Sequence, residues 1–236
     1  MRDGFVKVAV GTPAIRVADC RYNAESCFTL MREAYRQGVR VLCLPELCLT
    51  GYTCGDLFLQ DTLLDGAEEA LSTVLEATRS LDMIAAVGLP VRRHNKLYNC
   101  AAVIHKGEIL GVVPKTHLPN YGEFYEKRQF APAPEEDDYI ALCGQEAVPF
   151  GAGQIFPCEN LPELTLGFEI CEDLWAPEPP SVRMAKAGAT VIENLSASNE
   201  VIGKDAYRRQ LVTAQSARLL CGYLYASSGE GESTSD

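Results

Sequence analysis

Histidine is scarce in this chain, and its cysteines lack the spacing of a metal site. The 236 residues include three histidines, His94, His105 and His117, and none pairs with cysteines at zinc-ligand spacing. The ten cysteines contain no CxxC pair and are scattered through apolar stretches. Such cysteines are typical of reduced, mostly buried thiols in a reducing compartment. We therefore predict that the protein has no metal site and is cytoplasmic.

Long apolar runs and an excess of positive charge are also absent. The first residues lead directly into the strand-like "FVKVAV", without the apolar region and cleavage site of a signal peptide. No apolar run approaches the roughly 20 residues that a transmembrane helix needs. The formal net charge of -11 argues against non-specific binding of nucleic acid or anionic lipid. We expect a small molecule or a protein as the partner, and neither nucleic acid nor membrane.

The composition is that of a soluble globular domain. Hydrophobic residues make up 47% and charged residues 22% of the chain, a balance that supports a packed core. We find no internal repeat, no low-complexity tract and no linker that would mark a domain boundary. The length suits one large domain, and we predict a single domain over residues 1–236.

Strand and helix periodicities alternate along the first half of the chain. Strands are indicated at 5–10, 39–44 and 83–90, and apolar residues recur at helical spacing from Ala24 to Ala34 and from Ala67 to Leu81. Because hairpins interrupt this alternation further on, the pattern predicts an α/β layered fold with a mixed sheet.

The second half begins with a predicted hairpin that turns at Lys106 and Gly107. The stretch 117–153 is rich in proline, glycine and acidic residues, and we interpret it as a long surface loop. Further elements are expected in this order: a strand at 164–170, a short helix at 181–187, a strand at 189–195, a helix at 204–219 and a strand at 221–228.

Three residues of reactive type each follow a predicted apolar strand: Glu46, Lys115 and Cys171. If these strands are neighbours, a base, a cation and a nucleophile converge at one edge of the sheet. The cysteine is followed at once by two acidic residues, which disfavour a thiolate. A nearby lysine would oppose this by lowering the pKa of the thiol, and a buried glutamate would take its proton. This set of groups suits acyl transfer from an amide or a nitrile.

Each of these residues also has a purely structural explanation. A glutamate or lysine at a strand end is usually solvated or salt-bridged, and most buried cysteines only fill a core. A thiol-protease arrangement would instead use His117 as the base, but it would leave Glu46 and Lys115 unexplained. A further alternative is a binding or scaffold module with an inactive site, an interpretation against which the three reactive residues argue.

The segments around these residues resemble a known family. "LPELCLTGY", "VPKTHLPNYGEFYE" and "GFEICEDLW", in this order, are similar to the motifs of the nitrilase superfamily of carbon-nitrogen hydrolases. The resemblance implies a four-layer α-β-β-α sandwich. It also implies Glu46 as the general base, Lys115 as the oxyanion-stabilising cation and Cys171 as the nucleophile. The family has a further glutamate after the lysine, and Glu123 fits that position.

Within the superfamily, "NYGEFYEKRQF", "ICEDLWAP", "NLSASN" and "GEGESTSD" resemble the glutaminase domain of glutamine-dependent NAD synthetases. The resemblance implies glutamine as substrate, a cysteinyl thioester, and release of ammonia for a second, synthetase domain. Tyr121, Glu172 and Ser198 would line the glutamine pocket, with the Glu172 carboxylate suited to the α-ammonium group. The alternative is a stand-alone amidase or carbamoylase that acts on another small amide with the same triad.

The chain departs from the family at its end. It stops at Asp236, whereas a complete domain of this family continues for additional strands, and it lacks the SGG-type pyrophosphate-binding loop of a synthetase domain. We therefore expect a C-terminally truncated hydrolase domain without its synthetase domain. It would need no cofactor, since ATP and magnesium belong to the missing domain. The resemblance also implies a homo-oligomer.

Overall fold

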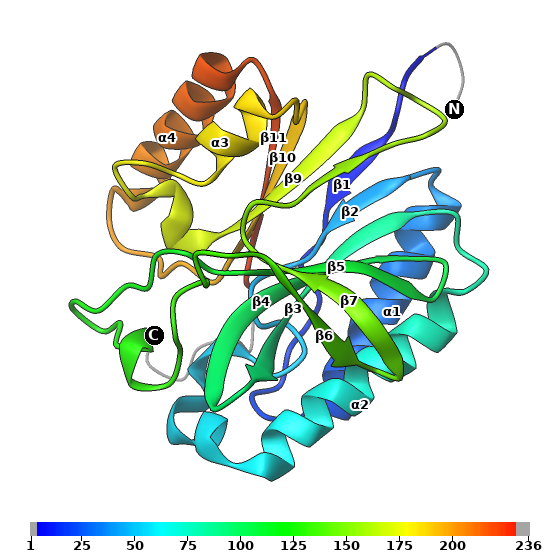
Figure 1. Cartoon of the computed structure of the whole chain (residues 1–236). Helices are drawn as coiled ribbons and strands as arrows, with labels where there is room; N and C mark the ends of the chain where they lie inside the picture. The colour runs from blue at the N-terminus through cyan, green and yellow to red at the C-terminus, as the bar shows by residue number, and fades with distance from the viewer. Residues whose placement is uncertain (1–3, 230–236) are drawn as a thin grey trace.

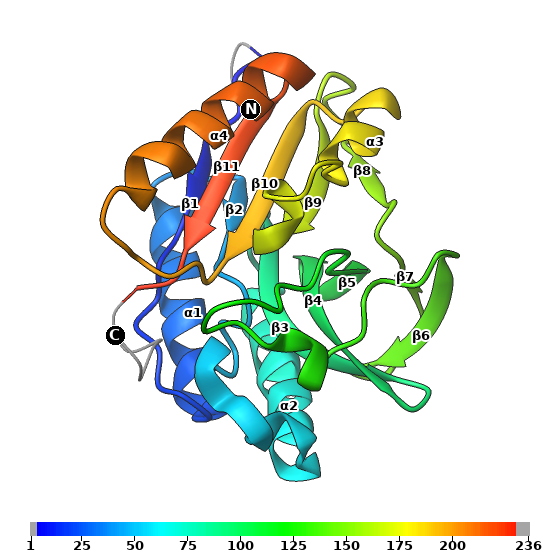
Figure 2. The same ribbon diagram turned by 90° about the vertical axis from the view of Figure 1, so that its left-hand side faces the viewer.

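The computed structural model describes residues 4–229, which fold into four layers. Two β-sheets face each other, and each sheet carries a pair of helices on its outer face, as Figures 1 and 2 show from two directions. The α-β-β-α sandwich predicted from the family resemblance is thus confirmed.

The first sheet has seven strands and is mixed. Its order is β1 (Val8–Val10), β2 (Val41–Cys43), β3 (Ile84–Arg93), β4 (Lys96–His105), β5 (Glu108–Pro114), β7 (Gln145–Phe150) and β6 (Asp138–Leu142). Strands β1, β2 and β3 are parallel, whereas β4 is antiparallel to both of its neighbours. The β4–β5 turn was predicted correctly: Lys106 and Gly107 both have positive φ, as a two-residue hairpin turn requires.

The second sheet has four strands and contributes the other inner layer. Its order is β11 (Gly222–Ser227), β10 (Val191–Ser196), β9 (Thr165–Ile170) and β8 (Ile155–Pro157). The first three are parallel, and the carboxyl ends of β9 and β10 therefore lie at the same edge.

Helices cover the outer face of each sheet. α1 (Cys20–Arg36) and α2 (Asp61–Thr78) pack on the first sheet, and α3 (Ser181–Lys186) and α4 (Lys204–Leu219) lie over the second (Figure 1). The Asp19 side chain caps α1 by accepting a hydrogen bond from the Tyr22 amide at 3.1 Å. No helix within residues 4–229 is both long and apolar enough to span a membrane.

The space between the sheets is filled by small and medium apolar side chains. The first sheet contributes residues such as Ala86 and Ala101, and the second contributes Phe168, Ile170 and Leu195, all completely buried. Burying each of the larger side chains contributes about 1.5–3 kcal/mol. The small alanines let the sheets approach closely, so groups at facing strand ends come within contact distance.

One sequence-based prediction of the fold was wrong. The stretch 117–153 is not a single surface loop, because it contains the β6–β7 hairpin, which turns at Cys143 and Gly144, both with positive φ. Its strands are short and carry acidic residues on their solvent side, so their apolar alternation was too weak to recognise. The part before this hairpin, 115–137, carries only the short 3-10 helix η2 (Glu126–Arg128).

Candidate active site

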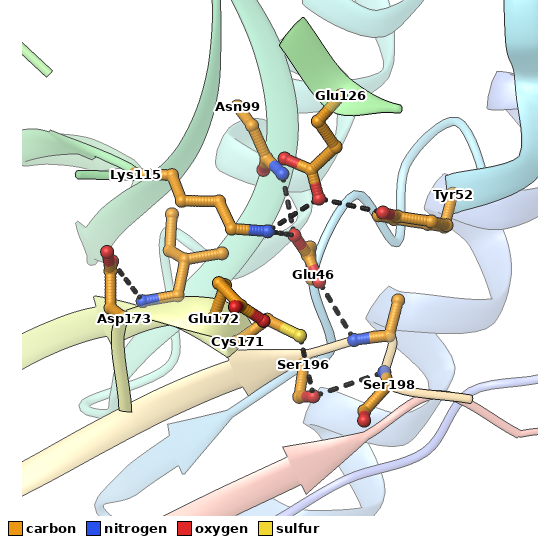
Figure 3. A network of polar contacts seen from close by, with 12 residues as sticks. Glu46, Tyr52, Asn99, Lys115, Glu126, Cys171, Glu172, Asp173, Ser196 and Ser198 are labelled. Atoms are coloured by element: carbon orange, nitrogen blue, oxygen red, sulfur yellow. Dashed lines mark hydrogen bonds and ion pairs between the residues drawn. The ribbon is translucent and has the colours of Figure 1, made fainter. Parts of the chain in front are cut away.

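Glu46, Lys115 and Cys171 meet in the gap between the two sheets (Figure 3). Glu46 and Lys115 follow β2 and β5 of the first sheet, and Cys171 follows β9 of the second. The three strands are not neighbours, because β3 and β4 separate β2 from β5 and the cysteine comes from the facing sheet. The groups converge because strand ends of two stacked sheets face one another.

The Glu46 carboxylate is buried and fully hydrogen-bonded. Its Oε1 accepts from Lys115 Nζ and from Asn99 Nδ2, both at 2.6 Å, and its Oε2 accepts from the Ala197 amide at 2.9 Å. The last contact joins Glu46 directly to the loop after β10 of the other sheet. These bonds fix the orientation of the carboxylate.

Gly88 on β3 allows the backbone that carries Glu46 to approach. A Cβ atom built at this position would lie 2.3 Å from the Leu47 nitrogen and 2.5 Å from the Pro45 oxygen. No side chain fits at such distances, because the neighbouring atoms belong to backbone and cannot rotate away.

Lys115 is completely buried between two carboxylates. Its Nζ lies 2.6 Å from Glu46 Oε1 and 2.6 Å from Glu126 Oε1. Burial alone would lower the pKa of Lys115, but the charges of Glu126 and Glu46 hold this pKa well above its ordinary value. The site therefore contains a permanent ammonium group.

The carboxylate beside Lys115 comes from Glu126, whereas the family resemblance placed the further glutamate at Glu123. Glu123 lies in the exposed loop before η2, and its carboxylate accepts a hydrogen bond from Asn199. Glu126 is buried and also accepts from the Tyr52 hydroxyl at 2.7 Å. Both glutamates lie in the same acidic segment, and spacing alone did not distinguish them.

Cys171 occupies a strained turn at the end of β9. Its φ is 45°, in the left-handed region that residues with a side chain rarely adopt, and the 3-10 helix η3 (Cys171–Leu174) starts there. Side-chain acceptors hold this turn: Asp173 Oδ2 accepts from the Ile170 amide at 2.9 Å, and Asn194 Oδ1 accepts from the Cys171 amide at 3.1 Å. The turn aims the sulfur into the gap between the sheets (Figure 3).

Asp173 also joins the turn at Cys171 to the segment after Lys115. Its Oδ1 accepts from the amides of Thr116 and His117, at 3.1 and 2.7 Å. Apart from burial, the largest effects on the pKa of the Cys171 thiol come from Glu46, Lys115, Ser196 and Glu126, none of which is a histidine. His117 thus contributes its backbone to the site, and the geometry does not favour its imidazole as a base.

The Cys171 thiol is neutral at rest. Burial and the Glu46 carboxylate raise its pKa to about 12, although Lys115 and a hydrogen bond from Ser196 act in the opposite direction. We expected the lysine to lower this pKa overall, but its charge is shared with two carboxylates. Deprotonation therefore requires a base at the moment of attack, and Glu46 lies beside the thiol (Figure 3).

Ser196, which was not predicted from the sequence as a site residue, contacts the sulfur. Its Oγ donates to Cys171 Sγ at 3.3 Å and is itself 2.6 Å from the Tyr225 hydroxyl. Ser198 donates its amide to Ser196 Oγ at 3.2 Å. Both serines belong to the "NLSASN" segment, and the alternation along β10 would have indicated that Ser196 and Asn194 share one face.

Tyr121 and Glu172 contact each other, and neither is among the residues that line the cavity described below. The Tyr121 hydroxyl is 3.0 and 2.9 Å from the two Glu172 oxygens, and the tyrosine ring is exposed. Both residues were predicted from the sequence to bind substrate, and the structure places them in direct contact.

A cavity of about 500 Å³ adjoins the charged cluster. Its wall is largely aromatic and polar and includes Tyr52, Phe58, Phe124, Glu126, Phe130 and Ser198. Glu126 belongs both to this wall and to the ion pair with Lys115, so the cavity borders the reactive groups. Among the residues described, no three His, Cys, Asp or Glu side chains are arranged to hold a metal ion.

A thiol, a carboxylate and an ammonium group at the strand ends of an α-β-β-α sandwich are the arrangement that the resemblance to carbon-nitrogen hydrolases implies. The model of one family, carbon-nitrogen hydrolase, matches residues 7–227, and the chain belongs to this family.

Its relatives include glutamine-dependent NAD(+) synthetases. The one from Mycobacterium tuberculosis (strain ATCC 25618 / H37Rv) is 45% identical over 233 residues, which are 99% of this chain and 34% of that protein. A solved glutamine-dependent NAD(+) synthetase from Cytophaga hutchinsonii is 32% identical with a TM-score of 0.82, over 94% of this chain and 36% of that one.

A solved amidase from Nesterenkonia sp. superposes with a TM-score of 0.75 at 20% identity, over 98% of this chain and 80% of that one. This match supports the fold alone. The chain spans about a third of the length of the NAD(+) synthetases that it matches.

Proposed function

We propose that this chain hydrolyses the side-chain amide of glutamine through a thioester on Cys171. The observation that carries the proposal is the fully buried pair of Glu46 and Lys115, joined at 2.6 Å and placed beside a cysteine in a strained turn. Burying two charges is costly unless they are paired, and a buried pair stabilises a fold little compared with apolar packing. Such a pair next to a thiol is therefore best explained by chemistry.

The first half of the reaction forms the thioester. Glu46 takes the thiol proton as Sγ attacks the amide carbon, and the carbonyl oxygen becomes an oxyanion. The Lys115 ammonium and the backbone N–H of Glu172 stabilise this charge, an effect worth roughly 3–4 kcal/mol per donor. When the intermediate collapses, Glu46 returns the proton to the leaving nitrogen, and ammonia departs.

The second half hydrolyses the thioester. Glu46 takes a proton from a water molecule as the oxygen attacks the thioester carbon, and the same two donors hold the second oxyanion. Collapse breaks the carbon–sulfur bond, glutamate leaves and Cys171 regains its proton. Glu126 keeps Lys115 in place throughout and balances its charge.

Glutamine is supported as the substrate by the polar groups next to Cys171 and by the relatives. Glu172 offers a carboxylate for the α-ammonium group of a free amino acid, with Tyr121 beside it and Ser198 in the cavity wall. In the full-length protein we propose that the ammonia serves a synthetase domain for NAD synthesis, in which ATP and magnesium act. We further propose a cytoplasmic homo-oligomer.

The test is ammonia release from glutamine compared with a panel of small amides. We expect a clear preference for free glutamine, and Cys171→Ala should abolish release while the circular dichroism spectrum stays unchanged. A preference of less than a few-fold over other amides would instead favour a stand-alone amidase or carbamoylase.

A second measurement separates an active site from an inert module. A diazoketone analogue of glutamine should modify Cys171 and none of the other nine cysteines, as peptide mass spectrometry would show. Equal labelling of Cys171 and the remaining thiols would leave only a binding or scaffold role.

A further inference from the structure

The backbone amide of Cys171 is held by a side chain that itself belongs to a buried hydrogen-bond chain. Asn194 on β10 accepts from the Cys171 N–H through Oδ1 and donates through Nδ2 to the Tyr223 hydroxyl at 3.3 Å. Tyr223 on β11 donates in turn to Glu169 Oε1, and Glu169 Oε2 accepts from the Ser181 amide at 2.8 Å. A chain of hydrogen bonds thus connects α3 to the nucleophile turn.

The hydrogen bonds of this network can run in only one direction. A backbone N–H only donates, so Asn194 must present its oxygen to Cys171 and its NH₂ group to Tyr223. The tyrosine oxygen therefore accepts from Asn194, and its hydrogen needs another acceptor, which Glu169 supplies. The Ser181 amide at the far end also only donates, so both oxygens of Glu169 must be acceptors.

Because both oxygens of Glu169 accept hydrogen bonds, its carboxyl group is ionised. Burial raises the pKa of Glu169 above its ordinary value, although hydrogen bonds from Tyr223, Ser181 and Asn194 act in the opposite direction. Both oxygens of this buried carboxylate are paired, which is the arrangement that keeps a buried charge in a core.

We propose that Asn194 is a positioning residue for the Cys171 nucleophile and that the direction of its amide is set by Tyr223 and the carboxylate of Glu169. The inference rests on the proposed function, because it assigns a task to residues around the proposed nucleophile. The Cys171 N–H is committed to Asn194, which agrees with the Glu172 N–H as the backbone donor of the proposed reaction.

Glu169→Gln tests the direction of the chain with an isosteric change. The glutamine side chain keeps one oxygen, and the backbone N–H of Ser181 must donate to it. The new NH₂ group therefore faces Tyr223, and the hydrogen of the Tyr223 hydroxyl loses its acceptor. Asn194 then has to turn its oxygen toward Tyr223, so its NH₂ group faces the Cys171 N–H and two donors meet. We expect kcat for glutamine to fall at least about 10-fold with KM changed less than about 3-fold, because a misplaced nucleophile affects the reacting geometry.

The double variant Glu169→Gln with Asn194→Asp is the decisive comparison. The carboxylate introduced on β10 offers two acceptors, one for the Cys171 N–H and one for the Tyr223 hydroxyl, and the net charge equals that of the original chain. We expect the single change Asn194→Asp to lower kcat about 10-fold or more, because two carboxylates then compete for one hydroxyl hydrogen. The double variant should regain at least about 5-fold over the weaker single variant.

Hydrogen exchange gives a readout other than turnover. The Cys171 amide should be protected in the original chain, and its exchange should speed up at least about 10-fold in Glu169→Gln and in Tyr223→Phe. The double variant should restore its protection. Tyr223→Phe removes the hydroxyl without adding a donor, and it serves if Glu169→Gln does not fold.

The exposed Glu163 provides the matched control, since Glu163→Gln should change neither kcat nor exchange. The inference would be overturned if the original chain is active and Glu169→Gln keeps both its kcat and its exchange rate. It would also be overturned if the kcat losses of the two single variants multiply in the double variant. An original chain that releases no ammonia from glutamine and escapes the diazoketone would overturn the proposed function instead.

Discussion

Two buried acids in the gap between the sheets differ in their surroundings. Glu46 has three hydrogen-bond donors, one of them the Lys115 ammonium. Glu193 on β10 is equally buried, yet within residues 4–229 neither of its carboxyl oxygens has a hydrogen-bond partner of ordinary geometry, and the weak thiol donor of Cys43 lies beside it. Burial raises the pKa of Glu193 to about 8, so this side chain is neutral where Glu46 pairs with a cation.

The difference shows that burial alone does not mark a functional acid. A buried carboxyl group without a cation avoids ionisation and destabilises the fold when it is charged, whereas a carboxylate paired with an ammonium group can keep its charge in the interior. The two acids can be compared by mutation because both lie in the same sandwich and neither is exposed.

Lys115→Met should give the largest effect. It leaves Glu46 and Glu126 facing each other without a cation, and breaking a buried ion pair in this way costs about 3–5 kcal/mol of unfolding free energy. The same change removes an oxyanion donor, so turnover of glutamine should fall at least about 100-fold. Urea unfolding and ammonia release measure the two losses, and a variant that keeps most of its turnover would refute the role of Lys115.

Glu193→Gln should remove a pH dependence from the stability. The folded pKa is about 8 and the ordinary value is 4.5, so the unfolded chain releases this proton first and stability falls as pH rises between these values. From pH 5.5 to 7.5 the native chain should lose about 2–3 kcal/mol more than the variant does. Urea midpoints at both pH values test this, and parallel curves would show that Glu193 is ionised at neutral pH.

Glu126→Gln and Glu123→Gln form a matched pair in one segment. Glu126 contacts Lys115, whereas Glu123 contacts Asn199 at the surface. We expect Glu126→Gln to lower kcat about 10- to 100-fold, because Lys115 loses one of its two counter-charges. Glu123→Gln should lower kcat less than about 3-fold. The reverse order would restore the assignment of Glu123 made from the sequence.

Arg128→Met should have the smallest effect. Arg128 forms a two-pronged ion pair with Asp56, at 2.8 and 2.9 Å, just beyond Glu126. Both side chains are exposed, and exposed ion pairs contribute at most about 1 kcal/mol. Thermal unfolding should therefore change little, and a loss comparable to that of Lys115→Met would mean that the η2 segment depends on this surface contact.

Periodicity predicted most of the fold, and the motifs pointed to three residues that the structure brings together between the sheets. The helix at 204–219 and the hairpin at Lys106 and Gly107 were placed correctly because their patterns are local. The β6–β7 hairpin was missed because its short strands carry polar residues. The stacking of β9 against the first sheet is a long-range arrangement, and no local pattern encodes it.

The reactive groups could be named from sequence, but their partners could not. Asn99, Ser196 and Asn194 are ordinary polar residues of strands, and only the order of the strands within each sheet brings them to Glu46 and Cys171. Glu126 was missed in favour of Glu123 because this segment has only one short 3-10 helix, and its sequence lacks a periodicity that would show which of its acids turns inward.

The close approach of main chain at Gly88 has a consequence for how this enzyme tolerates change. Residue 88 has no functional group, yet even a single methyl group there would push the Pro45–Leu47 peptides outward and carry the proposed general base away from its lysine. A saturation screen scored by activity would rank position 88 alongside the reactive residues. Loss of function on substitution of a glycine can thus report on the geometry of the neighbouring backbone.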